Sequence, residues 1–410
     1  MKFESYDIAP AIKKSLAEAG FLKPTDIQYK SIPPILGGED VMAIAQTGTG
    51  KTAAFAIPII DLIIQMKKVE DEEAVKCLVL VPTRELAMQI AEVFQKLGKY
   101  TKVKTICITG GKEQAPQIAE LEKGVDIIVA TPGRMFDLIY QKHLKITKVE
   151  ILVLDEADHM LDLGFINDIR DVKKFLHRKH QTLFFSATIN EEIKDLAYSL
   201  VRNPIRIQIS PKDRVSKNID HSVALIVMDD KRFFLERLVK ENPLSKILVF
   251  VRTQVRAERV FKAMERVGIK TLTMHGGKEQ EDRLSVLKDF KSGEVKVLIA
   301  TDISARGIDI PNVEYVINYD LPDEVENYVH RVGRTGRGVN KGIAFSFCSP
   351  EEKEILAEIE AFLEKPVKVI DIDKNDYADT LDFTEDINND WKSLIKEAEE
   401  DKKKKKGKKK

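Results

Sequence analysis

One short stretch, from Ala45 to Thr52, constrains the fold more than any other part of the sequence. It reads Ala-Gln-Thr-Gly-Thr-Gly-Lys-Thr. The apolar run Val41–Ala45 predicts a strand before it, and the residues from Thr52 to Ile57 predict the start of a helix. A glycine-rich turn between a strand and a helix directs backbone N–H groups and a helix N-terminus towards one point. The stretch is therefore expected to bind an oxyanion.

This turn also has the side chains that a nucleoside triphosphate requires. Gly48 and Gly50 permit the tight turn, and Lys51 can reach the β- and γ-phosphates. Thr52 can hold Mg²⁺ through its hydroxyl. The general pattern of such loops has a glycine where this chain has Ala45. The alternative is that the stretch is a glycine-rich turn whose lysine has no function. The predicted strand before it and the helix after it disfavour this alternative.

Short apolar runs recur along the chain, and polar or glycine residues follow each of them. In the first half they are 41–45, 77–81, 105–108, 126–130, 151–154 and 182–185, with helical stretches such as 85–97 and 114–122 between them. In the second half they are 246–251, 270–274, 295–300, 315–319 and 342–347. Short apolar strands that alternate with helices predict an α/β fold, with parallel sheets covered by helices on both faces. Ligands of such sheets bind at the carboxyl ends of the strands.

The polar stretch between the two halves sets the expected domain boundaries. We expect a nucleotide-binding domain over 1–208, a linker over 209–218 and a second domain over 219–372. Residues 373–410 are acidic and then rich in lysine, so they are expected to be a largely disordered tail. The second domain has no glycine-lysine loop of its own, which predicts one nucleotide site that the partner domain completes.

The composition restricts the class of protein. No run of eighteen apolar residues occurs, and the N-terminus lacks the apolar core of a signal peptide, so no membrane association is expected. Cys77, Cys107 and Cys348 are widely spaced within apolar runs, and no Cys/His spacing indicates zinc. These features favour a cytoplasmic protein with buried thiols.

The charge is balanced overall but unevenly distributed. The chain has 66 basic and 66 acidic residues, and eight of the lysines lie in residues 402–410. Without that segment the chain is acidic. Nucleic-acid binding must therefore depend on local basic patches and on the tail, which we expect to be an electrostatic tether or only a solubilising segment.

Two further patterns indicate chemistry at a phosphate. Asp155 and Glu156 directly follow the apolar run 151–154, where one carboxylate can reach Mg²⁺ and the other can orient or deprotonate a water molecule. The run 328–337 has arginines at 331, 334 and 337. These are either a solvated basic loop or arginine fingers that stabilise charge on a transferring phosphoryl group.

Gln28 and several turns after strands offer other polar contacts. An amide such as Gln28 can pair with an adenine edge through two hydrogen bonds, although most such glutamines are surface residues. The turns contain hydroxyls, glycines and single arginines, which suit a sugar-phosphate backbone and carry no base code. The turn residues expected to contact such a backbone are Pro82, Thr83, Arg84, Gly110, Gly111, Thr131, Gly133, Arg134, Arg252, Thr253, Gly276, Arg283 and Thr301.

Together these motifs resemble those of the DEAD-box ATP-dependent RNA helicases of superfamily 2. Residues 155–158 spell Asp-Glu-Ala-Asp, and Phe3 lies seventeen residues before Gly20, as in that family. Ser-Ala-Thr at 186–188, Gln-Glu-Asp-Arg at 280–283, Ala-Arg-Gly-Ile-Asp at 305–309 and the run 330–337 complete the set. Ala45 is the family's own form of the loop. The resemblance covers residues 3–370, and within the family the chain looks most like the compact bacterial RhlE-type branch.

The resemblance implies roles for individual residues. Phe3, Phe21 and Gln28 would bind adenine, and Asp309 would contact the ribose. The triphosphate would lie on Gln46, Thr47, Gly48, Thr49, Gly50, Lys51 and Thr52, with Mg²⁺ on Thr52 and Asp155. Catalysis would use Lys51, Asp155, Glu156, Arg334 and Arg337, and Asp158, Ser186, Thr188 and His330 would couple the ATP and RNA sites. Asp26 stands where the family has proline, which could change the turn before Gln28.

The sequence thus predicts two RecA-like domains and an RNA-dependent ATPase. ATP would bind the first domain, and single-stranded RNA or a short RNA duplex would bind across both. Joint binding would close the cleft and distort the RNA. One alternative is an ATP-gated RNA clamp in which unwinding is incidental, and another is a DNA-directed motor, which no residue excludes. A monomer is expected, and the sequence identifies no protein partner.

Overall fold

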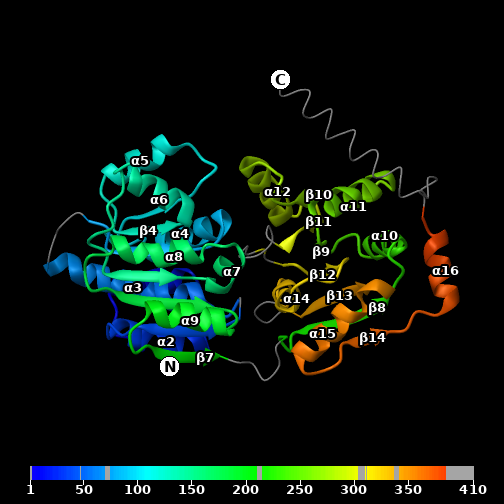
Figure 1. The fold of residues 1–410 in the computed structure, drawn as a ribbon, viewed down its shortest axis with the longest axis horizontal. Coiled ribbons are helices and arrows are strands. Elements are labelled where there is room, and N and C mark those ends of the chain that lie inside the picture. Colours follow the sequence, from blue (N-terminus) through cyan, green and yellow to red (C-terminus); the bar gives the residue numbers. More distant parts are fainter. Residues whose placement is uncertain are drawn as a thin grey trace. The chain divides into compact units, whose positions relative to one another are not determined.

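The computed structural model describes residues 2–46, 48–69, 74–209, 215–302, 310, 312–336 and 341–384. The chain divides into two compact units, Met1–Ser210 (unit 1) and Pro211–Lys410 (unit 2). Each unit is built around a seven-stranded sheet with helices on both faces (Figure 1). The expected α/β class with two layered domains is confirmed.

Unit 1 contains a fully parallel sheet with the strand order β3-β4-β2-β5-β6-β1-β7. The strands are β1 (Val41–Ala45), β2 (Cys77–Leu80), β3 (Thr105–Ile108), β4 (Ile127–Ala130), β5 (Ile151–Leu154), β6 (Gln181–Ser186) and β7 (Ile205–Ile209). The carboxyl ends of all these strands therefore lie at one edge of the sheet, which is the edge where ligands were expected to bind.

The helices of unit 1 cover the sheet in two layers. They are α1 (Pro10–Glu18), α2 (Asp26–Leu36), α3 (Lys51–Val69), α4 (Arg84–Leu97), α5 (Gln114–Glu122), α6 (Pro132–Tyr140), α7 (Ala157–Asp162), α8 (Ile166–Val172) and α9 (Glu191–Leu200). Alternate residues of β1 enter separate cores, with Val41 and Ala43 among residues of α2 to α4 and Met42 and Ile44 among residues of α6 to α9. Both faces of β1 are thus buried, which fixes the strand that leads into the glycine-rich turn at residues 46–52, called the phosphate loop below.

Unit 2 repeats this architecture, with the parallel order β10-β11-β9-β12-β13-β8-β14. Its strands are β8 (Ile219–Leu225), β9 (Ile247–Phe250), β10 (Thr271–Met274), β11 (Val297–Ala300), β12 (Tyr315–Asn318), β13 (Gly342–Cys348) and β14 (Lys368–Ile370). Its described helices are α10 (Lys231–Glu241), α11 (Gln254–Arg266), α12 (Gln280–Ser292), α14 (Val325–Val332), α15 (Lys353–Leu363) and α16 (Lys374–Asp382). Each strand of unit 2 has the same place in its sheet as the unit 1 strand whose number is lower by seven, so that β8 corresponds to β1 and β12 to β5.

Strands β7, β8 and β14 were not expected from the sequence. β7 exposes Ile205, Arg206 and Gln208 and buries only Ile207 well, and β14 is exposed along its whole length. β8 interrupts its buried residues with Asp220 and His221. These strands lack a fully apolar run because they lie at or beside a sheet edge, where polar residues are tolerated.

The expected tail begins with a helix. α16 packs on α10 through the ring of Tyr377 against Phe234, with centroids 4.9 Å apart. The Tyr377 hydroxyl donates to Asp230 Oδ2 at 2.8 Å. The sequence expectation of a largely disordered tail therefore differs from the structure over 374–382, because one aromatic residue anchors an otherwise polar segment. The lysine-rich end, 402–410, lies outside the described residues.

No helix within the described ranges combines the length and the apolarity that a membrane crossing requires.

Candidate active site

The phosphate loop joins β1 to α3 in unit 1, as the sequence predicted. Gly48 and Gly50 have φ values of 80° and 95°, in the left-handed region that glycine favours. The Thr49 hydroxyl donates to the Gln46 carbonyl at 2.7 Å and fixes the turn. Thr47 is outside the described residues.

Lys51 is the first residue of α3, and its ammonium group is buried. The residue is 7% exposed, and Nζ has no hydrogen-bond partner among the described residues. A buried ammonium without a partner is costly, so this arrangement suits an oxyanion that would bind between the helix N-terminus and Lys51. Thr52 follows it and is half-buried, within reach of the same anion.

Gln28 lies on α2 and is fastened to the phosphate loop. Its Oε1 accepts from the backbone N–H of Thr25 at 2.9 Å, and its Nε2 donates to the carbonyl of Gly50 at 3.2 Å. A Cβ at Gly50 would lie 2.6 Å from Nε2, so only glycine fits there. An amide has two lone pairs and two N–H groups, so one of each is left for a ligand.

Phe3 and Phe21, the other expected adenine contacts, lie beside each other. Their ring centroids are 6.2 Å apart in an edge-on arrangement. Phe3 is 3% exposed and belongs to the core of unit 1, whereas Phe21 is 36% exposed. Phe21 therefore offers an open ring face, and Phe3 supports it from below.

Asp155 and Glu156 follow β5 directly, beside Lys51. Burial raises the pKa of Asp155 to about 7; the charge of Lys51 opposes this and that of Glu156 adds to it. Glu156 has a φ of 52°, an uncommon conformation for a residue with a side chain, and its N–H donates to Asp155 Oδ1 at 3.0 Å. The backbone is therefore constrained where two carboxylates must face one ligand.

His159, which was not expected from the sequence, lies three residues after Glu156 on α7. It is 2% exposed, and its Nδ1 is 3.6 Å from Glu156 Oε2. Within the described part of the chain, neither ring nitrogen has a hydrogen-bond partner. Glu156 directly precedes α7, so the spacing of three brings the two side chains close together at the helix start. His159 therefore lies beside the Glu156 carboxylate without a hydrogen bond to it.

Asp158 connects α7 to the turn after β6. Its Oδ2 accepts from the backbone N–H groups of Ala187 and Thr188 at 3.1 and 2.9 Å, and from the Thr188 hydroxyl at 3.1 Å. Ser186 ends β6 and is fully buried. The structure thus brings together three of the four residues expected to couple the two ligand sites; the fourth, His330, lies on α14 of unit 2.

The RNA contacts expected in unit 1 lie after β2, β3 and β4, which are adjacent in the sheet. The guanidinium of Arg84 lies against the turn at Gly110 and Gly111, where a Cβ on Gly111 would approach its Nη1 to 2.0 Å. Arg134 donates to the carbonyl of Lys112 at 3.2 and 3.3 Å. The other residues of this group are Pro82, Thr83, Thr131 and Gly133, in the same turns or at the adjoining helix starts.

The RNA contacts expected in unit 2 also follow strands of its sheet. Arg252 donates to the Leu321 carbonyl and to Glu352, so much of its guanidinium is used within the protein. Gly276 follows β10 next to His275, whose Nε2 lies 2.7 Å from Glu258 Oε1. Thr253 and Thr301 follow β9 and β11, and Arg283 lies in the first turn of α12.

Arg334 follows α14 and is 3% exposed. Its Nε donates to the carbonyl of His330 at 3.2 Å. Asp309 and Arg337, the expected ribose contact and second arginine finger, lie outside the described residues.

Comparisons with known proteins give a consistent result. The DEAD/DEAH box helicase family matches residues 25–196, and the helicase conserved C-terminal domain matches residues 230–339. The DEAD-box ATP-dependent RNA helicase RhpA of Helicobacter pylori is 40% identical over 368 residues, which are 88% of this chain and 74% of RhpA. The ATP-dependent RNA helicase RhlB of Shewanella frigidimarina is 38% identical over 388 residues, 93% of this chain and 88% of RhlB.

A solved structure extends the comparison to the fold. Dbp5 of S. cerevisiae, bound to RNA and ADP BeF3, is 30% identical with a TM-score of 0.81. The match covers 96% of this chain and 99% of that chain. The expected RecA-like architecture of both units is confirmed.

Asp158 should be essential for the stability of the turn after β6. Replacing Asp158 with alanine leaves three donors without their acceptor, so we expect unit 1 to lose about 2–3 kcal/mol of unfolding free energy. Chemical denaturation of the full chain measures this, and Asp162→Ala on the exposed side of the same helix is the control. Equal losses of unfolding free energy in the two variants would show that the hydrogen bonds of Asp158 do not stabilise this turn.

Proposed function

The chain belongs to the DEAD-box family of ATP-dependent RNA helicases, and we propose that its two units carry out one ATP-driven cycle of RNA remodelling. ATP binds unit 1, and single-stranded RNA binds both units. The two ligands together favour a closed state that distorts the RNA and opens short duplexes, and hydrolysis returns the open state. The observation that carries this proposal is the buried ammonium of Lys51 in the phosphate loop next to Asp155.

In this proposal the phosphate loop, 46–52, holds the triphosphate, and Phe21 and Gln28 select adenine with support from Phe3. Asp309 would contact the ribose. Thr52 and Asp155 would hold Mg²⁺, a cation that takes one or two protein ligands together with phosphate oxygens. Bound Mg²⁺ would neutralise charge on the phosphates and favour the ionised form of Asp155, whose pKa burial raises.

Hydrolysis then requires a positioned water molecule and a cation at the γ-phosphate. Glu156, whose backbone is constrained and whose carboxylate lies beside His159, would hold and deprotonate the water. Arg334 and Arg337 would stabilise the charge of the transition state from unit 2, which has no phosphate loop of its own. Asp158, Ser186, Thr188 and His330 would make hydrolysis depend on RNA.

The RNA would lie on the strand-end turns of both sheets, held mainly at its sugar-phosphate backbone. Arg84 and Arg134 would be fixed donors in unit 1, and the turns at Thr253, Gly276 and Thr301 would continue the contact in unit 2. We further propose a cytoplasmic monomer and domain limits of 1–208, 209–218 and 219–372. Assignment to the RhlE-type branch stays a prediction.

Two other functions share much of this site. An ATP-gated RNA clamp would use the same residues with slow release, and a DNA-directed motor would use the same backbone contacts. The intact Glu156 and Arg334 favour turnover over clamping. The selection of RNA over DNA depends on 2′-hydroxyl contacts made largely by the protein backbone.

The proposed function predicts an ATPase that RNA stimulates. We expect hydrolysis by the full chain to be slow alone and to rise in the presence of single-stranded RNA, because RNA shifts the population towards the closed state. Single-stranded DNA of the same sequence should stimulate much less. The rate of phosphate release with each nucleic acid measures this. Equal stimulation by DNA would favour the DNA motor, and the lifetime of the RNA complex in ATP separates the helicase from the clamp.

Glu156→Gln should separate binding from turnover. The glutamine keeps the size of the side chain but cannot accept a proton from water, so we expect hydrolysis to fall by about 10²–10⁴-fold. ATP and RNA binding should persist, and the RNA complex should be long-lived in ATP. Glu191→Gln, on an exposed helix start, is the control. RNA release from Glu156→Gln as fast as from the unmodified protein would contradict the assigned role.

Gln28→Ala should reduce the preference for adenine. The lost bidentate contact corresponds to about 1–3 kcal/mol, expressed mainly in the KM for ATP. Because Gln28 also holds Gly50, some loss should appear with every nucleotide, so the test compares ATP with GTP for both proteins. We expect the unmodified protein to prefer ATP and the variant to prefer it less. If the preference for ATP over GTP is the same in both proteins, Gln28 does not select adenine and only supports the phosphate loop.

A further inference from the structure

Unit 2 has a lysine at the place that corresponds to Lys51. Lys51 lies six residues after Ala45, the last residue of β1, and begins α3. Lys231 lies six residues after Leu225, the last residue of β8, and begins α10. β8 occupies the place of β1 in the matching strand order of unit 2. The two lysines are therefore equivalent in the topology of their sheets.

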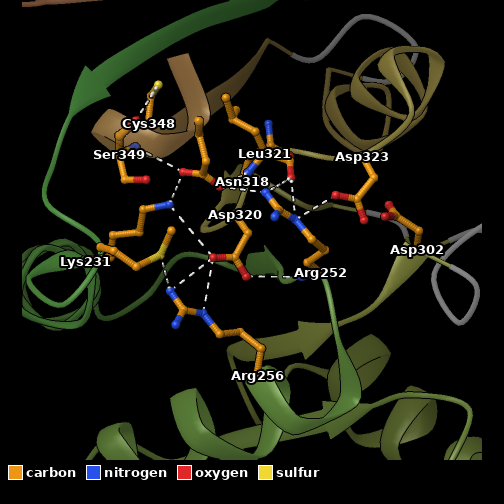
Figure 2. Close-up of polar contacts among 12 residues, drawn as sticks. Lys231, Arg252, Arg256, Asp302, Asn318, Asp320, Leu321, Asp323, Cys348 and Ser349 are labelled. Atoms are coloured by element: carbon orange, nitrogen blue, oxygen red, sulfur yellow. Dashed lines mark hydrogen bonds and ion pairs between the residues drawn. The ribbon is translucent and has the colours of Figure 1, made fainter. Parts of the chain in front are cut away.

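An aspartate also corresponds between the two units. Asp155 directly follows β5, and Asp320 lies two residues after the last residue of β12, the equivalent strand. The charge of Lys51 acts on Asp155, and the Lys231 Nζ lies 3.8 Å from Asp320 Oδ1. Figure 2 shows Lys231 and Arg256 directed at Asp320 from different helices. Unit 2 thus keeps the pair of charges that indicates a phosphate site in unit 1.

The two sites differ in what surrounds the ammonium group. Lys231 is fully buried, and its Nζ lies 2.5 Å from Oε2 of Glu352, which is 2% exposed. The same carboxylate accepts from the backbone N–H of Ser349 at 3.0 Å and of Leu321 at 3.0 Å, and from the Arg252 guanidinium at 3.0 Å. Two cations and two backbone N–H groups from separate strand ends therefore surround one carboxylate.

This combination of donors is the one that protein sites use for phosphate. Backbone N–H groups at strand ends, a lysine at a helix start and an arginine together bind an oxyanion. We propose that unit 2 retains an oxyanion site equivalent to the phosphate site of unit 1 and that the Glu352 carboxylate fills it. On this proposal unit 1 alone offers a nucleotide site, because Glu352 occupies the equivalent place in unit 2.

The loop before α10 limits what an opened site could hold. Residues 226–230 contain no glycine and end in Asp229 and Asp230, in contrast to the loop with Gly48 and Gly50 in unit 1. Two carboxylates would repel a polyphosphate, and without the glycines the backbone cannot wrap around one. The opened site would accept a single small oxyanion such as inorganic phosphate, and not a nucleoside triphosphate.

Glu352→Ala in the full chain tests the proposal by rescue with inorganic phosphate. The variant should be destabilised because Lys231 and Arg252 lose their shared anion. Millimolar phosphate should then raise its unfolding midpoint by about 4 °C or more relative to chloride at equal ionic strength. Both the variant and its parent carry Lys51→Ala, so that phosphate binding in unit 1 does not contribute. The parent should not respond.

Two further variants make the result specific. Glu236→Ala removes another buried carboxylate of unit 2, which pairs with Lys240 at 3.0 Å but belongs to no strand-end site. It should lose stability without rescue by phosphate. Adding Lys231→Met to Glu352→Ala should abolish the rescue. If phosphate restores Glu236→Ala equally, or does not restore Glu352→Ala, the proposal is wrong.

Glu352→Gln keeps the test decisive if Glu352→Ala does not fold. The amide has the size of the carboxylate but no charge, so it removes the anion that Lys231 and Arg252 share while it fills the space for phosphate. We expect a lower unfolding midpoint that phosphate does not restore. A midpoint equal to that of the unmodified protein would show that the site needs no anion and would overturn the proposal.

Discussion

Two opposite charges buried at the carboxyl edge of one parallel sheet, on Lys51 and Asp155, are the interaction on which the rest of the structure depends. The ammonium has no hydrogen-bond partner among the described residues, and burial opposes ionisation of the carboxyl group. Each group is therefore unfavourable without a ligand of opposite charge, and in the proposed cycle a nucleotide phosphate with Mg²⁺ would supply both charges. Strand β1, buried on both faces, gives the loop the rigid base that this requires.

The two units differ at equivalent places in a way that favours nucleotide binding by one sheet only. Both have the same strand order and a lysine at the same helix start. In unit 1 glycines at positive φ shape an open loop. In unit 2 Glu352 accepts the hydrogen bonds that a phosphate would accept. We propose that this closure leaves unit 2 to supply Arg334 and RNA contacts to a reaction whose substrate unit 1 holds.

Much of this could be predicted from the sequence, because parallel sheets are built from short apolar runs and place the residues after them at one edge. The sequence located in this way the loop at Gly48 and Gly50 and the two carboxylates that follow β5, Asp155 and Glu156. Strands β7 and β14 were missed because exposed edge strands lack an apolar run. The contact of Lys231 with Glu352 joins residues 121 positions apart, and no local pattern indicates such a pairing.

The most direct test of the account is the rate of ATP hydrolysis in a single turnover by Arg334→Lys, measured with saturating RNA beside the affinity for ATP. Lysine keeps the charge but not the planar fork that can bind two phosphate oxygens. The account predicts a rate lower by about 10³-fold or more, with ATP affinity within a few-fold of the unmodified protein. Hydrolysis at the full rate would show that unit 2 supplies no catalytic arginine at this position and would contradict the two-unit mechanism.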